Sequence, residues 1–318
     1  MSSQNSASGA YFNFLIKKDG AYIRKCFDGD PSKLKFQYEW LLRHQGLSCI
    51  PVVENPMFRW NYFSYDLKFY HDYRSFFEVI KEGDAFRCQE ILEKILKVLP
   101  LIHKDEKAVI SREQVVRYID DKFFKKIEYC EHLYPVLKQF NRHDKVIING
   151  KEILNYPLLR QKLLEIKTIE QLAHYNETET HGDLTVENIL IGPKDEVLLL
   201  DPNNENYVSS PLVDYAKFLQ SLHSRYEFLC LIETVEVKNH CVNFQIEANL
   251  VYDHLLKFFL SQMRERFFPQ EREQLVFHEA MHLARLLPYR LRMNEHSFMA
   301  FYGMMLLRFN EFLEGEII

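Results

Sequence analysis

The residues of this chain best placed to do chemistry begin with the pattern H-G-D-x-x-x-x-N, which spans residues 181–188. The stretch Asn188–Asp201 that follows is typical of a β-hairpin, with a turn at Gly192–Asp195. Because paired strands lie about 4.8 Å apart, the residue that enters a hairpin and the residue that leaves it share one end. The side-chain oxygens of Asn188 and Asp201 would therefore suit Mg²⁺, and Asp183, in the preceding loop, would accept a proton from a hydroxyl group.

The alternative interpretation of this stretch is structural. His181 and Asp183 would then hydrogen-bond to backbone groups of a buried, capped turn. One such residue alone would favour that interpretation. Four residues in this order and spacing favour a catalytic site, with His181 kept as a structural residue of the loop.

The segment resembles the catalytic loop and metal-binding segment of the aminoglycoside phosphotransferase and choline kinase superfamily, whose members are relatives of the protein kinases. The resemblance implies an ATP-dependent kinase, with GTP as the alternative nucleotide and Mg²⁺ as the metal. It implies that Asp183 is the catalytic residue and that Asn188 and Asp201 bind the metal.

The resemblance extends to the N-terminal region. Lys25, at the end of a predicted strand, resembles the lysine that binds the α- and β-phosphates, and Ile23 would lie against the adenine. Glu39 resembles the helix glutamate that pairs with this lysine. Ser8 lies in a loop, residues 5–10, that resembles the phosphate-covering loop. A complete lobe has a strand before that loop, and only four residues remain for it, so we expect that the strand is absent or that the chain comes from a longer polypeptide.

Two further segments complete the resemblance. Ser64–Leu67 is similar to the hinge that reads the edge of the adenine, so Tyr65 and Leu67 would bind the nucleotide. Asp214 resembles the aspartate that braces the catalytic loop through backbone N–H groups.

The phosphate acceptor is least defined by the sequence. The amide, arginine and tyrosine side chains after Asp201 favour a sugar or a sugar-derived metabolite, and Pro202 would stiffen the turn that carries them. Carboxylates of the helical region would instead receive an amine, as in an aminoglycoside or choline kinase, although charges on a helix usually form a solvated face. The first set is Asn203, Asn204, Glu205, His223, Arg225 and Tyr226; the second is Asp120, Asp121 and Glu128.

The expected order of strands and helices, together with the resemblance, indicates an α+β, protein-kinase-like fold of two lobes. Residues 1–67 would form a small lobe of sheet and one helix, and residues 68–318 a larger helical lobe with an insert at about 106–175. The expected hairpins are 11–27, 147–154 and 188–201, with short strands at 52–58 and 61–65. The expected helices are 32–45, 75–81, 85–103, 112–141 with a break near 133–135, 158–175, and most of 212–318, where 225–245 is least defined.

Composition excludes several other classes of protein. The 318 residues carry a net charge of −5, so no overall basic field would recruit nucleic acid. No Walker A, G-x-G-x-x-G or G-x-S-x-G pattern is present. The sequence shows no signal peptide, no apolar run long enough for a membrane span and no C-x-x-C pair, so we expect a cytoplasmic protein with reduced thiols. A small-molecule substrate is what the resemblance implies.

A second motif competes with the first. Residues 278–282 match H-E-x-x-H, the zinc-protease helix motif. The helical surroundings and the missing edge strand argue against a protease, and we expect one histidine to face the core and the other to face solvent. A non-catalytic nucleotide-binding module remains a further alternative, and the 12 residues between Asp201 and Asp214 leave no segment resembling a protein-kinase activation loop.

Overall fold

The computed structural model describes residues 13–16, 22–28, 31–60, 62–104, 108–173 and 175–315. The chain forms two compact units. The first comprises Met1–Lys104 and His181–Asn206, and the second comprises Asp105–Thr180 and Tyr207–Ile318. These units differ from the predicted lobes, because the predicted catalytic segment and the first helices after residue 67 belong with the N-terminal sheet. The α+β class, with a sheet-rich N-terminal part and a mostly helical remainder, is confirmed.

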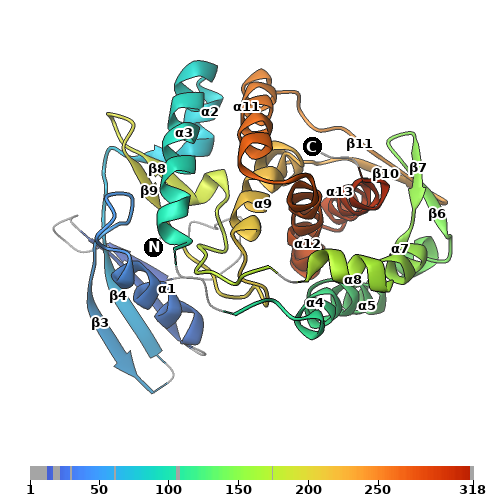
Figure 1. The fold of residues 1–318 in the computed structure, drawn as a ribbon, viewed down its shortest axis with the longest axis horizontal. Coiled ribbons are helices and arrows are strands. Elements are labelled where there is room, and N and C mark those ends of the chain that lie inside the picture. Colours follow the sequence, from blue (N-terminus) through green and yellow to red (C-terminus); the bar gives the residue numbers. More distant parts are fainter. Residues whose placement is uncertain are drawn as a thin grey trace. The chain divides into compact units, whose positions relative to one another are not determined.

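An antiparallel sheet forms the N-terminal part of the first unit (Figure 1). Its strand order is β1-β2-β4-β3, and the predicted hairpin of β1 and β2 is confirmed by the pairing of Asn13 with Cys26. The turn of that hairpin lies outside the described residues. The strands are β1 (Asn13–Ile16), β2 (Tyr22–Asp28), β3 (Val53–Arg59) and β4 (Tyr62–Lys68), and helix α1 (Ser32–Arg43) lies between β2 and β3 in the sequence.

The rest of the first unit is a small three-stranded sheet with two helices. Its strand order is β5-β8-β9, and the β8–β9 hairpin is the one predicted at residues 188–201. Ser75 starts the first of these helices with a capping box, in which its hydroxyl and the Glu78 carboxylate each accept a backbone N–H. The elements are β5 (Arg74–Ser75), α2 (Phe76–Lys81), α3 (Ala85–Ile102), a 3₁₀ turn (Val186–Asn188), β8 (Ile189–Ile191) and β9 (Val197–Leu199).

Helices form most of the second unit around one large apolar core. The break predicted near residue 134 is confirmed, because Pro135 occupies the first turn of a new helix. The predicted helix at 158–175 is instead two helices. The helices are α4 (Arg112–Ile119), a π-helical turn (Asp120–Phe124), α5 (Lys125–Leu133), α6 (Pro135–Phe140), α7 (Tyr156–Leu163), α8 (Ile166–Leu172), α9 (Pro211–Leu222), α10 (Tyr226–Leu229), α11 (Leu250–Arg266), α12 (Pro269–Met293) and α13 (Glu295–Glu314).

A four-stranded sheet also belongs to the second unit. The predicted hairpin of β6 (Lys145–Ile148) and β7 (Lys151–Leu154) is confirmed, and Asn149 and Gly150 both have positive φ, as its tight turn requires. A second hairpin, β10 (Val235–Lys238) and β11 (Cys241–Phe244), replaces part of the region expected to be helical. It extends the sheet because β11 pairs in parallel with β6, a contact between distant parts of the sequence.

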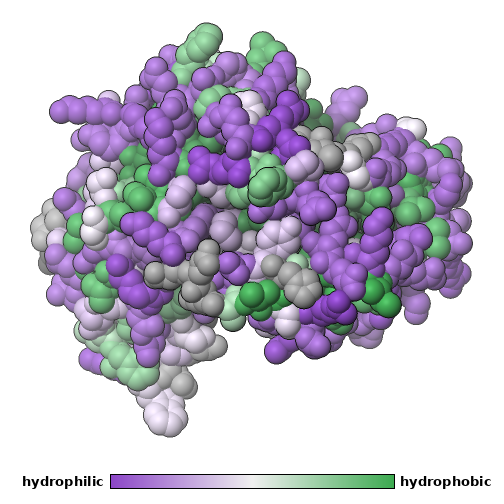
Figure 2. All heavy atoms as spheres, viewed as in Figure 1, coloured by the Kyte–Doolittle hydropathy of each residue, from purple (hydrophilic) through white to green (hydrophobic). Residues whose placement is uncertain are grey.

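The surface of the described residues is mostly hydrophilic (Figure 2), as expected from a sequence with 27% charged residues. Figure 2 shows one face of the molecule, on which hydrophilic side chains predominate and hydrophobic ones are scattered among them. Within the described ranges, no helix is both long enough and apolar enough to cross a bilayer.

Candidate active site

The β8–β9 hairpin brings the two predicted metal ligands to the same end. Ile189 pairs with Leu199, and the next backbone hydrogen bond runs from the Leu200 N–H to the Asn188 carbonyl, at 2.8 Å. Asn188 therefore enters the first strand opposite the point where the chain leaves the second strand for Asp201. This arrangement is the one expected from the spacing.

Asp183 is joined to the hairpin by Asn188. The Asn188 Nδ2 donates to the Asp183 carbonyl at 2.8 Å and to the Asp183 carboxylate Oδ2 at 3.2 Å. These bonds orient the predicted proton acceptor. They also commit the amide nitrogen of Asn188, so its Oδ1 is the atom suited to a metal ion.

Lys25 approaches the same end of the hairpin from β2. Its side chain is almost wholly buried, and its ammonium makes an ion pair with the Asp201 carboxylate. Burial alone lowers the pKa of Lys25, but the charge of Asp201 and the adjacent Tyr65 outweigh it, so this pKa lies above its usual value. Burial raises the pKa of Tyr65 to about 12. The predicted phosphate-binding lysine and the predicted metal-binding aspartate thus neutralise one another in this structure.

The loop at residues 181–183 packs tightly against the turn that follows Asp201. Gly182 has a φ of +80°, and a Cβ added there would lie 1.9 Å from the Asn203 carbonyl oxygen. The Asn203 N–H donates to the His181 carbonyl at 2.7 Å, and the Asn206 side chain donates to the Gly182 carbonyl at 3.1 Å. Glycine is therefore required here. Asp201 itself has a φ of 59°, a left-handed conformation that few residue types adopt readily.

The predicted pair between Lys25 and Glu39 is wrong for this structure. Glu39 makes an ion pair at 3.7 Å with Lys35 of the same helix, and its side chain is 48% exposed. The reason is helical periodicity. The buried face of α1 carries Leu34, Gln37, Trp40 and Leu41, which directs Glu39 toward solvent.

The predicted hinge is also misplaced. Ser64–Leu67 lies inside β4, between β2 and β3, so the sheet uses the backbone groups that would read an adenine. Tyr65 pairs across the strands with Lys25, and Leu67 pairs with Ile23. Since these pairs are two residues apart, Ile23 and Leu67 share the face of the sheet that carries Lys25.

Asn203 and Glu205 have structural contacts in the first unit. The Asn203 side chain is buried and its Oδ1 accepts the Glu205 N–H at 2.8 Å. The Glu205 carboxylate makes an ion pair at 3.3 Å with Lys33. These contacts are internal to the protein, and a substrate role for either residue stays a prediction.

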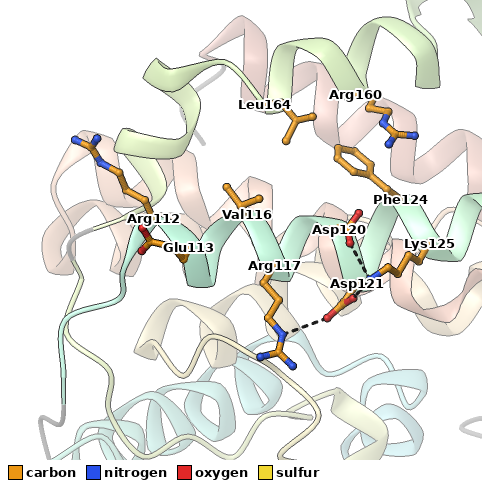
Figure 3. Close-up of a pocket in the computed structure, with 10 residues that line it drawn as sticks. All are labelled: Arg112, Glu113, Val116, Arg117, Asp120, Asp121, Phe124, Lys125, Arg160 and Leu164. Atoms are coloured by element: carbon orange, nitrogen blue, oxygen red, sulfur yellow. Dashed lines mark hydrogen bonds and ion pairs between the residues drawn. The ribbon is translucent and has the colours of Figure 1, made fainter.

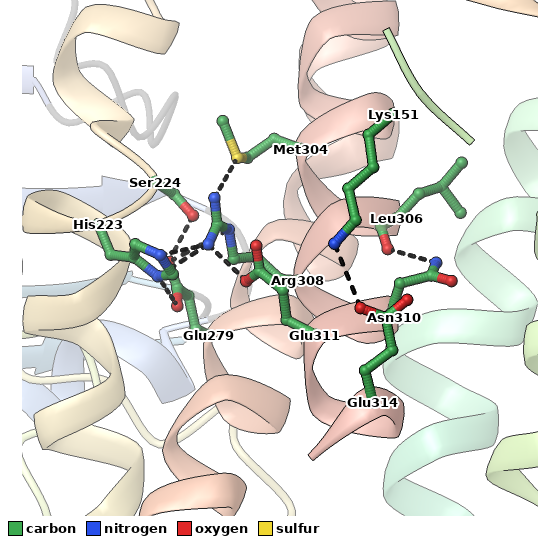
Figure 4. Close-up of polar contacts among 10 residues, drawn as sticks. All are labelled: Lys151, His223, Ser224, Glu279, Met304, Leu306, Arg308, Asn310, Glu311 and Glu314. Carbon is green, nitrogen blue, oxygen red and sulfur yellow. Dashed lines mark hydrogen bonds and ion pairs between the residues drawn. The ribbon is translucent and has the colours of Figure 1, made fainter. Parts of the chain in front are cut away.

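The predicted acceptor residues of the second unit are engaged in separate networks, of which Figure 4 shows the one around His223. The His223 Nδ1 donates to Glu279 at 3.0 Å. Arg225 donates to the Glu247 carbonyl at 3.0 Å and pairs with Asp253, and the Tyr226 hydroxyl accepts from Arg290 at 2.8 Å. Their polar groups serve internal contacts, so the structure does not bring these three residues together as a binding site.

The predicted amine-binding carboxylates line or adjoin a pocket of about 760 Å³ beside the π-helical turn (Figure 3). Each one already has a cation. Lys125 lies 2.8 Å from Asp120 and 2.6 Å from Asp121, and Arg160 lies 2.9 Å from Glu128. Hydrogen bonding to Lys125 lowers the pKa of Asp121. These carboxylates form ion pairs on the pocket rim.

The H-E-x-x-H residues do not converge on a metal. His278 lies 3.5 Å from the Tyr118 hydroxyl, the His282 Nε2 donates to the Val213 carbonyl at 3.0 Å, and Glu279 contacts His223. Both histidines are buried, so the expectation that one faces solvent is wrong. Burial lowers the pKa of His278 to about 3. No cluster of three potential metal-binding side chains occurs within the described part of the chain.

The structure does not test two of the predicted residues, and it reveals two contacts that the sequence did not predict. Ser8 lies outside the described residues, and Asp214 is fully buried in α9, where its bracing role remains a prediction. Sequence reasoning missed Asn206 and Trp40 as neighbours of the predicted catalytic loop. Both contacts join distant parts of the sequence, so no local pattern signals them.

Comparisons with known proteins give structural similarity only. No family model matches the chain, and no curated protein matches it. The match to the structure of the gentamicin complex of APH(2″)-IIa covers 96% of this chain and 89% of the APH(2″)-IIa chain, with 13% sequence identity and a TM-score of 0.49. The match to choline kinase from Cryptosporidium parvum Iowa II covers 96% of this chain and 88% of the choline kinase chain, with 9% sequence identity and a TM-score of 0.40. In its fold the chain is similar to these two solved structures.

Proposed function

We propose that this chain is a phosphotransferase that moves the γ-phosphate of ATP to a hydroxyl group of a small molecule. One observation carries the proposal. Within one compact unit, Lys25 of β2 pairs with Asp201, Asn188 hydrogen-bonds to Asp183, and Asn188 and Asp201 lie at the same end of the β8–β9 hairpin. A buried cation, a hydrogen-bonded carboxylate and a pair of oxygen ligands are the groups that phosphoryl transfer requires.

The side chains at the end of the hairpin fit Mg²⁺. The ion prefers a few protein oxygens together with phosphate oxygens, and this end of the hairpin offers the Asn188 Oδ1 and the Asp201 carboxylate, which is 35% exposed. When bound, Mg²⁺ would neutralise charge that develops on the transferred phosphate.

Lys25 is the residue that would change partner on nucleotide binding. Its pKa is raised, so it stays protonated, and its ion pair with Asp201 holds it at the site before a nucleotide arrives. We expect the phosphates to attract the ammonium away from Asp201 and so to release that carboxylate for the metal. Asp183, oriented by Asn188, would align the acceptor hydroxyl and accept its proton.

The base of the nucleotide would lie on the same face of the sheet. Ile23 and Leu67 form an apolar pair beside Lys25. Since Ser64–Leu67 is committed to the sheet, the residues that follow β4, from Phe69 onward, are better placed to read the edge of the base. ATP is the expected nucleotide and GTP the alternative.

For the acceptor, we propose a sugar or a sugar-derived metabolite before an amine. A polycationic acceptor would have to displace Lys125 and Arg160 from the carboxylates of the second unit, whereas a polyol would not. The aminoglycoside and choline classes remain the alternative.

The experiment is nucleotide binding followed by transfer. Thermal-shift measurements with ATP and GTP, each with and without Mg²⁺, should identify the nucleotide. Phosphorus NMR with a panel of sugars, aminoglycosides and choline should then show transfer to one class with kcat/KM above about 10⁴ M⁻¹s⁻¹, a typical enzyme value. Absence of nucleotide binding would refute the proposal. Binding without transfer to any acceptor would favour a non-catalytic nucleotide-binding protein.

A further inference from the structure

We propose that Trp40 is a positioning residue for the catalytic loop, because it holds His181 in place and thereby fixes Asp183. The activity part of this proposal rests on the proposed function. The structural part, a direct contact between helix α1 and the loop at residues 181–183, does not depend on it.

Trp40 is fixed within its own helix. The side chain is fully buried on the inward face of α1. Its ring stacks on the His44 ring, with centroids 4.1 Å apart and an interplanar angle of 28°. The His44 Nδ1 lies 2.8 Å from the Trp40 carbonyl oxygen, one helical turn away. The end of α1 therefore sets the orientation of the indole.

The indole then contacts the catalytic loop. The rings of Trp40 and His181 meet edge to face, with centroids 5.3 Å apart and an interplanar angle of 84°, a preferred arrangement for two aromatic rings. His181 is fully buried. On its other side, its carbonyl accepts the Asn203 N–H at 2.7 Å. His181 is therefore fixed between the helix and the turn that follows Asp201.

The position of Asp183 depends on this fixed His181. Its backbone N–H lies 3.4 Å from the His181 Nδ1, and only Gly182 separates the two residues. A smaller side chain at position 40 would leave a gap beside His181 and let the loop shift. Because Lys25 and Asp201 are carried by β2 and the hairpin, a loop shift should lower transfer without weakening nucleotide binding. A displacement of about 1 Å at a reacting group can cost about 100-fold in rate.

The contact itself is testable by fluorescence. The chain has two tryptophans, and Trp60 is 89% exposed, so Trp60→Phe leaves Trp40 as the single reporter. Indole emission depends on the groups that contact the ring. In the Trp60→Phe background, His181→Leu should change the intensity or the wavelength of the Trp40 emission, whereas His71→Leu, at an exposed histidine of the same unit, should not. Equal emission in both variants would overturn the contact.

The positioning role is tested by separating kcat from nucleotide affinity. Trp40→Leu should lower the transfer kcat by about 10- to 100-fold and leave the Kd for Mg·ATP within about threefold. Trp40→Phe, which restores an aromatic edge, should recover most of the kcat. Leu41→Ala, at the neighbouring buried position, is the control for lost packing, and each variant is assayed at the same interval below its own Tm.

The outcomes are distinct. Equal losses of kcat in Trp40→Leu and Leu41→Ala, or no recovery in Trp40→Phe, would overturn the positioning role. A wild-type protein that neither binds nucleotide nor transfers phosphate would refute the proposed function, while the emission measurement would still decide the contact. If Trp40→Leu does not fold, Trp40→Met takes its place, and an unchanged kcat in that variant would contradict the proposal.

Discussion

Residues 181–188 and residues 278–282 both place histidine next to carboxylates, but the surroundings of those carboxylates differ. Asp183 and Asp201 are only partly buried; Asp183 contacts Asn188 of the same motif, and Asp201 pairs with Lys25 of β2. Glu279 is fully buried and contacts His223, Ser224 and Arg308 (Figure 4). Polar groups enclosed by the core satisfy one another, whereas reactive groups must be reachable by a ligand. Convergence with accessibility, rather than a motif alone, distinguishes the two regions.

The largest expected effect tests the first region. Asp183→Asn should reduce the transfer kcat by about 10²- to 10⁴-fold, because the proton acceptor is lost, and should leave the Kd for Mg·ATP within a few-fold. Steady-state kinetics and calorimetric titration measure the two quantities. Asp195→Asn, at the tip of the same hairpin, is the control and should retain its activity. An Asp183→Asn enzyme that keeps most of its kcat would show that Asp183 is not the base.

The region at residues 278–282 should make the stability of the folded protein depend on pH. The pKa of buried His278 is about 3, below its usual 6.5, so the unfolded chain binds a proton that the folded chain does not. The resulting stability is present above pH 6.5 and is lost as the pH falls toward 3. When the pH falls from 7 to 5, the depressed pKa of this histidine should lower the free energy of unfolding by about 2 kcal/mol.

Urea unfolding at pH 7 and pH 5 measures that loss. His278→Phe should reduce the difference between the two pH values, whereas His132→Asn, at an exposed histidine, should not change it. An unchanged difference in His278→Phe would mean that His278 is protonated in the folded protein.

The smallest effect concerns Glu39. The half-exposed Glu39–Lys35 pair contributes roughly 0.3–0.5 kcal/mol, as surface pairs of this spacing do. Glu39→Gln should therefore change kcat and the Kd for Mg·ATP by less than about twofold. A tenfold loss in either quantity would mean that Glu39 approaches Lys25 once nucleotide binds, as the sequence resemblance implies.

Local sequence patterns correctly predicted the turns and helix breaks whose geometry is set by residues close together in the sequence. The turns at Asn149-Gly150 and Gly192–Asp195 specify their hairpins through backbone conformation, and the second of them brings Asn188 and Asp201 to one end. Pro135 likewise marks the break between two helices. In each case the residues that determine the geometry are close together in the sequence.

Predictions that depended on distant contacts were less successful. The β10–β11 hairpin joins a sheet by pairing with β6, 94 residues earlier in the chain, and no local pattern specifies that pairing. Glu39 was assigned by its position in a motif, but the buried face of α1 is set by Trp40 and Leu41. The ion pair of Lys25 with Asp201 and the contact of Trp40 with His181 likewise require the folded chain.

The most direct test of the account is the Mg²⁺ dependence of nucleotide binding. Calorimetric titration of ATP into the wild-type protein and into Asp201→Asn, each with and without Mg²⁺, isolates the contribution of the metal. The account predicts that Mg²⁺ tightens ATP binding to the wild type by more than about tenfold, because the carboxylate and the phosphates share the ion, and that Asp201→Asn loses this gain. An equal gain in both proteins would contradict the assignment of Asp201 and, with it, the proposed active site.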